Sequence, residues 1–513
     1  MSENRFFYLK QIIKATIISL FALFFSKLFA YAYRFLVARI GPEEYGLLSI
    51  GLAIFGFATA AGLLGYESGI VRPLAEYLGK NKREKVWQVI VAALKIALPV
   101  SLIITGIMFI FVNQITAFFH DDRLKQLIYL FAICVPIYTI YRIFLSVFRA
   151  FKKVDYEAIV VTGIENGLRV LFTGIGVYLG WRLFGVGVIY AICLGIGVIT
   201  AIILVKRLVP KPKILETLSK KESREILFFS LPLMFNTLAA YILGWTDTIM
   251  IGHFMNAREV GIYNTALPTA NILGIIPIAI LGVFIPIATE LWIKHKKKDV
   301  ENMYHRLTKW IAMSNLMVVA LIALFSKEII ETLFGQAYAE ASIALPILLA
   351  GYFAFSLSQV PTNMLNVVKK TKTIFYNTLI AGGLNLILNF FLVQKFGLVG
   401  AAISTTISYM IFTILCFGKV WKETNIKPLK NRDSMFFSAI GIAYLVAVFY
   451  TVTITTIFGM QGITAKVGAF IILSIIYGLL LWLGKVFETD DILLIKEIKQ
   501  RLTEKINGTK KKV

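Results

Sequence analysis

The sequence of 513 residues is short of charge and of cysteine. Asp, Glu, Lys and Arg make up 16% of it, against roughly 25% in soluble domains, while 58% of the side chains are hydrophobic. This balance excludes a disordered protein and an ordinary soluble enzyme. The three cysteines, Cys134, Cys193 and Cys416, lie far apart in apolar runs and form no CxxC pair, which excludes a disulfide scaffold.

Side chains that bind metals or nucleotides are also scarce. The four histidines are scattered and lack the spacing of metal ligands. No GxxxxGKS or GxxxxGKT loop is present to hold the phosphates of ATP. We therefore expect no metal site, no cofactor and no nucleotide hydrolysis by this chain.

Long apolar runs dominate the sequence and predict helices that span a membrane. A helix needs about 20 apolar residues to cross the roughly 30 Å of hydrocarbon. The first run is too long for a signal peptide and contains Lys27 and Arg34. We expect an all-α polytopic membrane protein with fourteen transmembrane helices, at residues 12–38, 45–72, 87–112, 124–148, 156–180, 185–205, 226–251, 260–288, 310–332, 341–367, 374–394, 398–418, 434–458 and 465–484.

The basic residues predict the orientation of these helices, because Lys and Arg accumulate on cytoplasmic loops. With fourteen alternating spans, 39 of the 53 Lys and Arg residues fall in segments on one side and eight on the other. Both termini are therefore expected in the cytoplasm, in a multi-pass protein of the cell membrane. The formal net charge of +24 is explained by this topology and by attraction to anionic lipid head groups, so no nucleic-acid partner is expected.

Short matching segments indicate an internal duplication. Their offsets stay between 212 and 217 residues along the chain, as in transporters built from two related bundles. The matched pairs are Gly46 with Gly261, Pro73 with Pro286, Lys152 with Lys369, and Phe184 with Phe396. We expect two pseudo-symmetric six-helix lobes, 1–210 and 211–425, with a cavity between them, then two additional helices within 426–487 and a basic cytoplasmic tail, 488–513.

Three segments carry a resemblance to a known family. They are 25–46 (FSKLFAYAYRFLVARIGPEEYG), 247–263 (DTIMIGHFMNAREVGIY) and 331–341 (ETLFGQAYAEA). In this order the chain resembles polysaccharide and lipid-linked oligosaccharide flippases, the polysaccharide branch of the multidrug/oligosaccharidyl-lipid/polysaccharide exporter superfamily. The resemblance implies a transporter and no enzyme. It implies that a polyprenyl-(pyro)phosphate-linked oligosaccharide crosses the cytoplasmic membrane by alternating access, for glycan biosynthesis. Glycosyltransferases of the same pathway are the expected protein partners, and a monomer with two lobes is sufficient.

Charged side chains within the spans are candidates for the substrate site, since each is costly in hydrocarbon. Lys27 and Arg34 are seven residues apart, so they share one helix face, with Tyr31 between them. With Arg142 and Arg169 they make a basic interior in the first lobe that suits a diphosphate, to which arginine offers a bidentate fork. We expect these five residues to bind the substrate.

Each assignment has a structural alternative. Arg142 and Lys95 can extend to the lipid head groups. Glu165 and Arg169 are four residues apart and can neutralise each other. Lys27 can form an ion pair, for which Glu67 is the expected partner.

Three acids are expected to couple transport to an ion or to form a gate: Glu67, Glu165 and Asp247. Asp247 lies near the outer end of its helix, where it either caps a turn or pairs with an arginine of the first lobe. The alternative function is a cation-coupled multidrug exporter of the same superfamily, which predicts an acidic cavity. A membrane glycosyltransferase predicts a long external loop, and the longest, about 326–340, is short. A scaffold for glycan assembly stays open.

Overall fold

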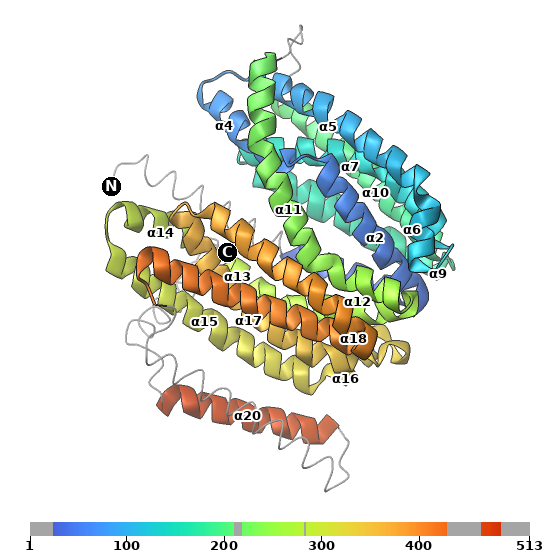
Figure 1. Cartoon of the computed structure of the whole chain (residues 1–513), viewed down its shortest axis with the longest axis vertical. Coiled ribbons are helices and arrows are strands. Elements are labelled where there is room, and N and C mark those ends of the chain that lie inside the picture. The colour runs from blue at the N-terminus through green and yellow to red at the C-terminus, as the bar shows by residue number, and fades with distance from the viewer. Residues whose placement is uncertain (1–23, 210–217, 282–283, 428–462, 484–513) are drawn as a thin grey trace, which may run out of the picture.

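The computed structural model describes residues 24–209, 218–281, 284–427 and 463–483 (Figure 1). Within these ranges the chain is helical and contains no β-strand. Nine of the described helices are long and apolar enough to cross a membrane. The expected span 434–458 and the tail 488–513 lie outside the described residues.

The first half of the chain forms one group of helices, which begins with a helical segment over residues 24–38. In this group α2, α5, α7 and α10 pack on one another, at one side of the molecule in Figure 1. Its elements are α2 (Pro42–Gly62), α3 (Tyr66–Gly69), α4 (Val71–Gly79), α5 (Glu84–Ile110), α6 (Val112–Phe119), α7 (Leu124–Ala150), α8 (Val154–Glu157), η1 (Ala158–Gly167), α9 (Leu168–Tyr178) and α10 (Leu183–Leu208).

The second half forms another group, in which α15, α17 and α18 pack together and α20 lies against α15 (Figure 1). Its elements are α11 (Lys220–Phe254), α12 (Ala257–Asn271), η2 (Ile272–Gly274), α13 (Ile275–Leu281), α14 (Phe284–Ile293), α15 (Lys297–Leu324), α16 (Ser326–Phe334), η3 (Gln336–Tyr338), α17 (Ala341–Val367), α18 (Thr371–Thr424) and α20 (Ile463–Leu483).

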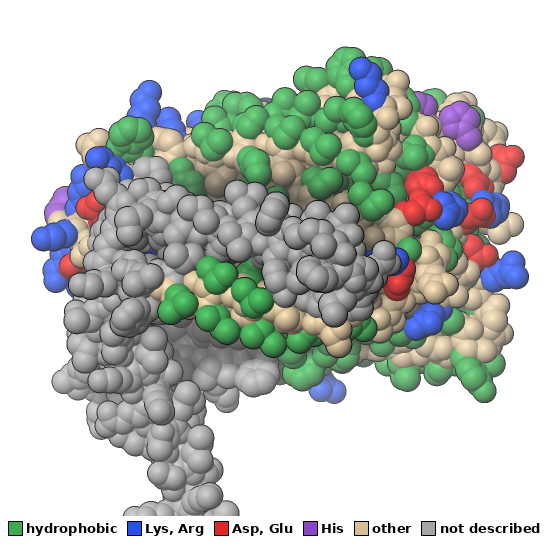
Figure 2. Space-filling view, turned by 90° about the horizontal axis from the view of Figure 1, so that it is seen from below, with side chains coloured by type: hydrophobic (Ala, Val, Ile, Leu, Met, Phe, Trp, Pro, Cys, Tyr) green, Lys and Arg blue, Asp and Glu red, His purple; other side chains and the backbone are tan. Residues whose placement is uncertain are grey.

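The side chains on the outside of the bundle fit a protein surrounded by lipid. Figure 2 shows hydrophobic side chains across the middle of one face, with Lys, Arg, Asp and Glu gathered toward its two ends. Large apolar residues such as Ile110, Ile199 and Ile414 are exposed. Exposed apolar surface of this extent would aggregate in water, so it requires an apolar solvent.

Three of the expected helices are broken where the sequence predicts continuity, one of them 310–332, which is divided between α15 and α16 at Phe325. The expectation of one helix over 45–72 is wrong, because α2 ends at Gly62 and the backbone of Leu64 and Gly65 is left-handed, with φ of 49° and 75°. The expected span 260–288 is likewise divided into α12, η2, α13 and α14, with Pro268 inside α12. The expected break between 374–394 and 398–418 is confirmed, since Gly397 inside α18 has a non-helical φ of 56°.

The break after α2 lets α11 attach to the first half. A Cβ on Gly65 or Gly69 would overlap Ser230 of α11, so only glycine permits this approach. Nearer the start of α11, Glu222 accepts hydrogen bonds from Lys85 Nζ (2.9 Å) and the Tyr77 hydroxyl (3.2 Å). Farther along, α11 packs on α18. One helix therefore spans from the first group to the second.

At the end that the sequence predicts to face outward, the two halves meet through α2 and α12. A Cβ on Gly46 would overlap the carbonyl oxygen of Ala257, and a Cβ on Gly261 would overlap that of Pro42. Because both obstacles are backbone atoms, the two helices cross at the closest distance that glycine allows. We call this contact the glycine crossing.

Hydrogen bonds reinforce the glycine crossing on both sides. The Tyr45 hydroxyl donates to the Asn264 carbonyl oxygen (3.0 Å), and the Tyr338 hydroxyl donates to that of Ala38 (2.7 Å). Each bond joins a residue of the first half to one of the second. The outer contact is thus both close-packed and hydrogen-bonded.

Candidate functional site

Three neighbouring chambers lie along the helices where the two halves meet. The largest, the cationic chamber, has a volume of about 510 Å³ and is lined by Lys27, Tyr31 and Arg34 together with residues of α11, α12, α13, α17 and α18. A second, the tyrosine chamber, has about 240 Å³ and lies mostly within the first half. The inner chamber, also about 240 Å³, lies between Glu67, Arg142 and the first half of α11.

The chambers are neighbours that share wall residues. Arg34, Trp245 and Asn264 line both the cationic and the tyrosine chamber. Tyr138 and Tyr241 line both the tyrosine and the inner chamber.

The helix face predicted from the sequence lines the cationic chamber. Lys27, Tyr31 and Arg34 all reach it, and the Tyr31 hydroxyl lies 3.0 Å from Thr269 Oγ1 of the second half. Arg34 lies beside the Tyr45 hydroxyl. In the part of the chain that the structure describes, no ion pair joins Lys27 or Arg34 to a carboxylate. Neither positive charge is therefore neutralised by a carboxylate of the described chain, which favours an anionic ligand.

Glu67 is paired with Arg142, and not with Lys27 as the sequence suggests. The Arg142 guanidinium contacts the Glu67 carboxylate directly, and Arg149 Nη1 lies 3.6 Å from it. Arg142 does not extend to the surface, since its side chain is 20% exposed and faces the inner chamber. Lys95 is exposed on α5 and lines none of the three chambers. The free positive charge in the cationic chamber thus comes from Lys27 and Arg34.

Breaking the Glu67–Arg142 pair is expected to cost stability more than substrate binding. The Glu67→Ala variant would leave Arg142 facing the cavity without its carboxylate, and we expect it to lower the free energy of unfolding by about 1–3 kcal/mol. Thermal denaturation of the purified protein measures this. A Glu67→Met/Arg142→Met double variant, which removes both charges, should recover much of the loss. Equal losses in the single and the double variant would contradict the pair's role.

The pair of Glu165 and Arg169, expected from their spacing, is present. Arg169 Nη2 lies 2.6 Å from Glu165 Oε1, and both side chains are 12% exposed. Tyr141 donates to Glu165 Oε2 at 2.8 Å, and the Arg169 guanidinium lies 4.2 Å from the centre of the Tyr190 ring. Glu165 is in η1, a π-helical turn, a feature frequent at functional sites. Arg169 lines the tyrosine chamber and not the cationic chamber.

Asp247 lies in the core of the second half, which corrects its expected pairing with an arginine of the first half. It is 4% exposed and accepts hydrogen bonds from the hydroxyls of Tyr263 and Thr405, each at 2.5 Å. The amides of Asn389 (2.9 Å) and Asn385 (3.4 Å) donate to its other oxygen. No described residue pairs with Asp247 as a cation, so one carboxylate is held by four neutral donors.

The two asparagines around Asp247 are functional candidates that sequence reasoning left unassigned. Their spacing of four residues places them on one helix face, which is the signal that could have found them. The Oδ1 atoms of Asn385 and Asn389 are buried and have no hydrogen-bond partner. Buried polar atoms without partners are uncommon in native structures. The cluster therefore has acceptor oxygens available to a cation beside a carboxylate.

Comparison with known proteins identifies the family. The sequence model for polysaccharide biosynthesis proteins matches residues 12–292, more than half of the chain. The chain belongs to this family. A second model, MatE, matches residues 232–391.

Curated relatives cover most of the chain at low identity. An uncharacterized membrane protein of Methanocaldococcus jannaschii, MJ1068, is 25% identical over 86% of this chain and 90% of its own length. The probable low-salt glycan biosynthesis flippase Agl15 of Haloferax volcanii is 24% identical over 74% of this chain and 77% of its own. A putative O-antigen transporter of Shigella flexneri is 22% identical over 74% of this chain and 90% of its own length.

Solved structures share the fold of this member of the family. The lipid II flippase MurJ in an inward closed conformation superposes with a TM-score of 0.71, at 16% identity, over 93% of this chain and all of that one. An inward-facing multidrug MATE transporter superposes with a TM-score of 0.68, at 18% identity, over 80% and 98%. The fold is therefore that of membrane flippases and exporters.

Proposed function

We propose that this protein is a flippase that moves a polyprenyl-(pyro)phosphate-linked oligosaccharide across the cytoplasmic membrane by alternating access. The observation that carries the proposal is the unpaired Lys27 and Arg34, facing a chamber between the two halves of the chain. An anionic phosphate is the ligand that such a site binds best. Relatives named as a glycan flippase and an O-antigen transporter support the same substrate class.

The walls of the cationic chamber suit a ligand with an anionic centre and an apolar tail. Lys27 and Arg34 lie opposite apolar side chains of α12, η2 and α13, among them Pro268, Ile272 and Ile275. In this proposal the two cations bind the phosphates, Tyr31 helps to position them, and the prenyl chain stays beside the apolar wall. Arg142 and Arg169 act from the neighbouring chambers.

The proposed architecture is the one expected from the sequence. Fourteen helices form two lobes, 1–210 and 211–425, with two further helices before a cytoplasmic tail. The nine long helices and the interruption of α18 at Gly397 support this count. Both termini are cytoplasmic, the working unit is a monomer, and glycosyltransferases of the same pathway supply the substrate.

The test is a proteoliposome assay with a labelled polyprenyl-pyrophosphate oligosaccharide. Exposure of the label to an impermeant probe outside the vesicle should rise with the purified full chain and not in empty vesicles. A fluorescent organic cation serves as the second substrate. Movement of the cation and not of the lipid would replace this proposal by the multidrug exporter, for which the MatE match is the specific support.

Ion coupling is proposed to reside chiefly at Asp247. Its carboxylate is buried without a cationic partner among the described residues, and a proton or Na⁺ would neutralise this charge. Glu67 and Glu165 stay in the proposal as gate residues, because protonating either one would release an arginine into a chamber.

The Asp247→Asn variant is expected to lose the response to an ion gradient. Its amide keeps the size of the carboxylate but not its charge, so transport driven by an imposed Na⁺ or H⁺ gradient should fall about tenfold. Exchange without a gradient should change much less. Both rates are measured in the same proteoliposomes, with Asp122→Asn, an exposed loop acid, as the control. A gradient response in Asp247→Asn equal to wild type would rule out coupling at this site.

A further inference from the structure

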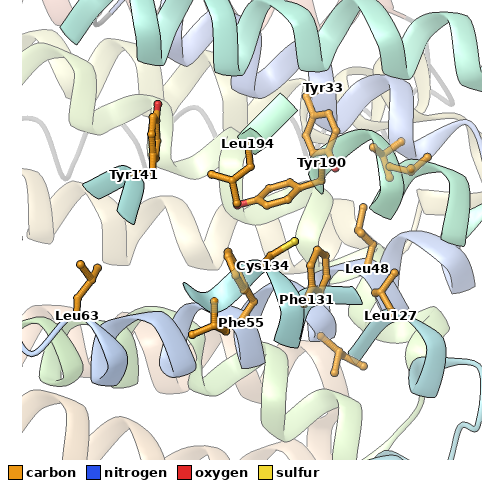
Figure 3. Close-up of a cluster of buried hydrophobic side chains, with 14 of the residues drawn as sticks. Tyr33, Leu48, Phe55, Leu63, Leu127, Phe131, Cys134, Tyr141, Tyr190 and Leu194 are labelled. Carbon is orange, nitrogen blue, oxygen red and sulfur yellow. The ribbon is translucent and has the colours of Figure 1, made fainter. Parts of the chain in front are cut away.

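The tyrosine chamber has a wall chemistry unlike that of the cationic chamber. Helices of the first half supply most of its wall, and α11 closes it with Tyr241 and Trp245. Figure 3 shows three residues of this wall, Tyr33, Phe55 and Tyr190, within a buried cluster that also contains Phe131. The wall combines apolar side chains and aromatic rings with polar groups, among them tyrosine hydroxyls and Asn166.

Several of these polar groups have no partner in the protein. Tyr33 is 8% exposed, and its hydroxyl has no hydrogen bond. Arg169 Nε is also buried without a partner. Among the described contacts, none is a hydrogen bond of the Tyr138, Tyr190 or Tyr241 hydroxyl. These three tyrosines line the chamber, so their hydroxyls offer hydrogen-bond donors and acceptors to a ligand.

Other tyrosines of the fold, including Tyr45 on the wall of this same chamber, do have hydrogen-bond partners. Tyr45, Tyr338 and Tyr477 each donate to a backbone carbonyl oxygen, at 3.0, 2.7 and 2.8 Å. Tyr141 and Tyr263 each donate to a carboxylate. Those hydroxyls stabilise the protein. In the tyrosine chamber, by contrast, the hydroxyls of Tyr138, Tyr190 and Tyr241 make no hydrogen bond among the described contacts.

Trp245 lies on the wall shared by the tyrosine and cationic chambers. Its indole makes no hydrogen bond and no ring contact with any described residue. By contrast, the indole of Trp87 donates to the Val209 carbonyl oxygen (2.9 Å) and packs against the Phe144 ring. An indole in a cavity with both its face and its N–H unused is suited to contact a ligand.

We propose that the tyrosine chamber is a saccharide-binding subsite, which takes the sugar next to the pyrophosphate. This inference rests on the proposed function and specifies where the glycan is bound and recognised. Trp245 packs on the apolar C–H face of the sugar ring, and the hydroxyls of Tyr138, Tyr190 and Tyr241 hydrogen bond its hydroxyls. Arg34, on the wall shared by both chambers, reaches the phosphate. The volume of about 240 Å³ admits a single ring.

Other occupants fit this chamber less well. A prenyl chain would cover the hydroxyls of Tyr138, Tyr190 and Tyr241 without pairing them, which costs free energy for each group. An organic cation finds no unpaired carboxylate there, because Glu165 is held by Arg169 and Tyr141. A sugar supplies both the apolar face and the hydroxyl groups that the wall can match.

The experiment compares binding with and without the sugar. The purified full chain is titrated with farnesyl pyrophosphate and with its glycosylated forms, each carrying one of several monosaccharides. Wild type should bind at least one glycosylated form about tenfold more tightly than the sugar-free probe. Trp245→Leu should reduce this preference to within about twofold, because it weakens binding of the glycosylated probe much more than binding of the sugar-free probe. Trp245→Phe keeps an aromatic face and should retain most of the preference. The control is Trp421→Leu, at an exposed position near the end of α18, which should retain all of it.

The outcomes separate this inference from the proposed function. Wild type that binds all probes equally, or a Trp245→Leu variant that weakens both kinds of probe to the same extent, overturns the saccharide subsite alone. Failure of wild type to bind any pyrophosphate overturns the proposed function as well. Should Trp245→Leu fold poorly, Tyr241→Phe removes one hydroxyl only and should lower the preference about threefold; an unchanged preference there also counts against the subsite.

Discussion

Replacing Arg34 with alanine is expected to reduce transport by about a hundredfold or more. Arg34 lines two of the three chambers and has no carboxylate partner among the described residues. A guanidinium that binds a phosphate through two charge-assisted hydrogen bonds contributes about 1.5–3 kcal/mol through each of them. Each 1.4 kcal/mol is about a factor of ten in affinity. The initial rate in the proteoliposome assay measures the loss.

Two further variants distinguish a binding role from a folding role. Arg34→Lys keeps the charge but loses the planar fork, so it should retain an intermediate rate. Arg39→Ala removes an exposed arginine near the same helix end, which lies 4.7 Å from the Phe35 ring and lines no chamber. It should transport as wild type does. Full transport by Arg34→Ala, with folding and insertion intact, would remove Arg34 from the site.

The part of the site that lies on one helix face was predictable from the sequence. The spacing of Lys27, Tyr31 and Arg34 fixes their common direction, because helix periodicity is a local property. The Glu165–Arg169 pair followed from the same rule. For both, the residues that must meet are within two helical turns, so no tertiary information was needed.

Contacts between helices far apart in sequence were not predictable in this way. Glu67 meets Arg142 because the chain turns after Gly62, which moves α3 out of line with α2. Asp247 is buried because α18 brings two asparagines to it, more than 130 residues later. Hydropathy identifies a span but does not say which face meets which neighbour. For the same reason, hydropathy did not predict the helix breaks at Leu64 and within 260–288.

The sequence correspondence of Gly46 with Gly261 acquires a physical meaning in the structure. With an offset of 215 residues, Pro42 corresponds to Ala257 and Gly46 to Gly261. Each glycine faces the carbonyl oxygen of the residue four positions before the other glycine. Such reciprocity is what a two-fold axis through the crossing would produce. The glycine crossing is therefore where a small steric change acts on both halves at once.

Adding a methyl group at the glycine crossing is expected to open the outer contact and stop transport. Gly46→Ala or Gly261→Ala would place Cβ against a backbone carbonyl that cannot move aside as a side chain can. Overpacking of this kind costs about 1–3 kcal/mol, against a gain of up to about 1 kcal/mol in helix propensity. The net effect is a shift away from the closed outer contact. We expect transport to fall more than tenfold in either variant.

The accessibility of position 38 measures the opening directly. Ala38 is 2% exposed at the outer contact, and the native cysteines are buried. In an Ala38→Cys background, Gly46→Ala should increase the rate of labelling by an impermeant maleimide added outside. Gly106→Ala is the matched control, because a Cβ there meets no atom within 4 Å; without a clash, it should be neutral or slightly stabilising. Both substitutions raise helix propensity by the same amount, so a difference in labelling rate between them is due to the clash at the glycine crossing. Equal labelling in both would mean that the outer contact does not depend on the glycine crossing.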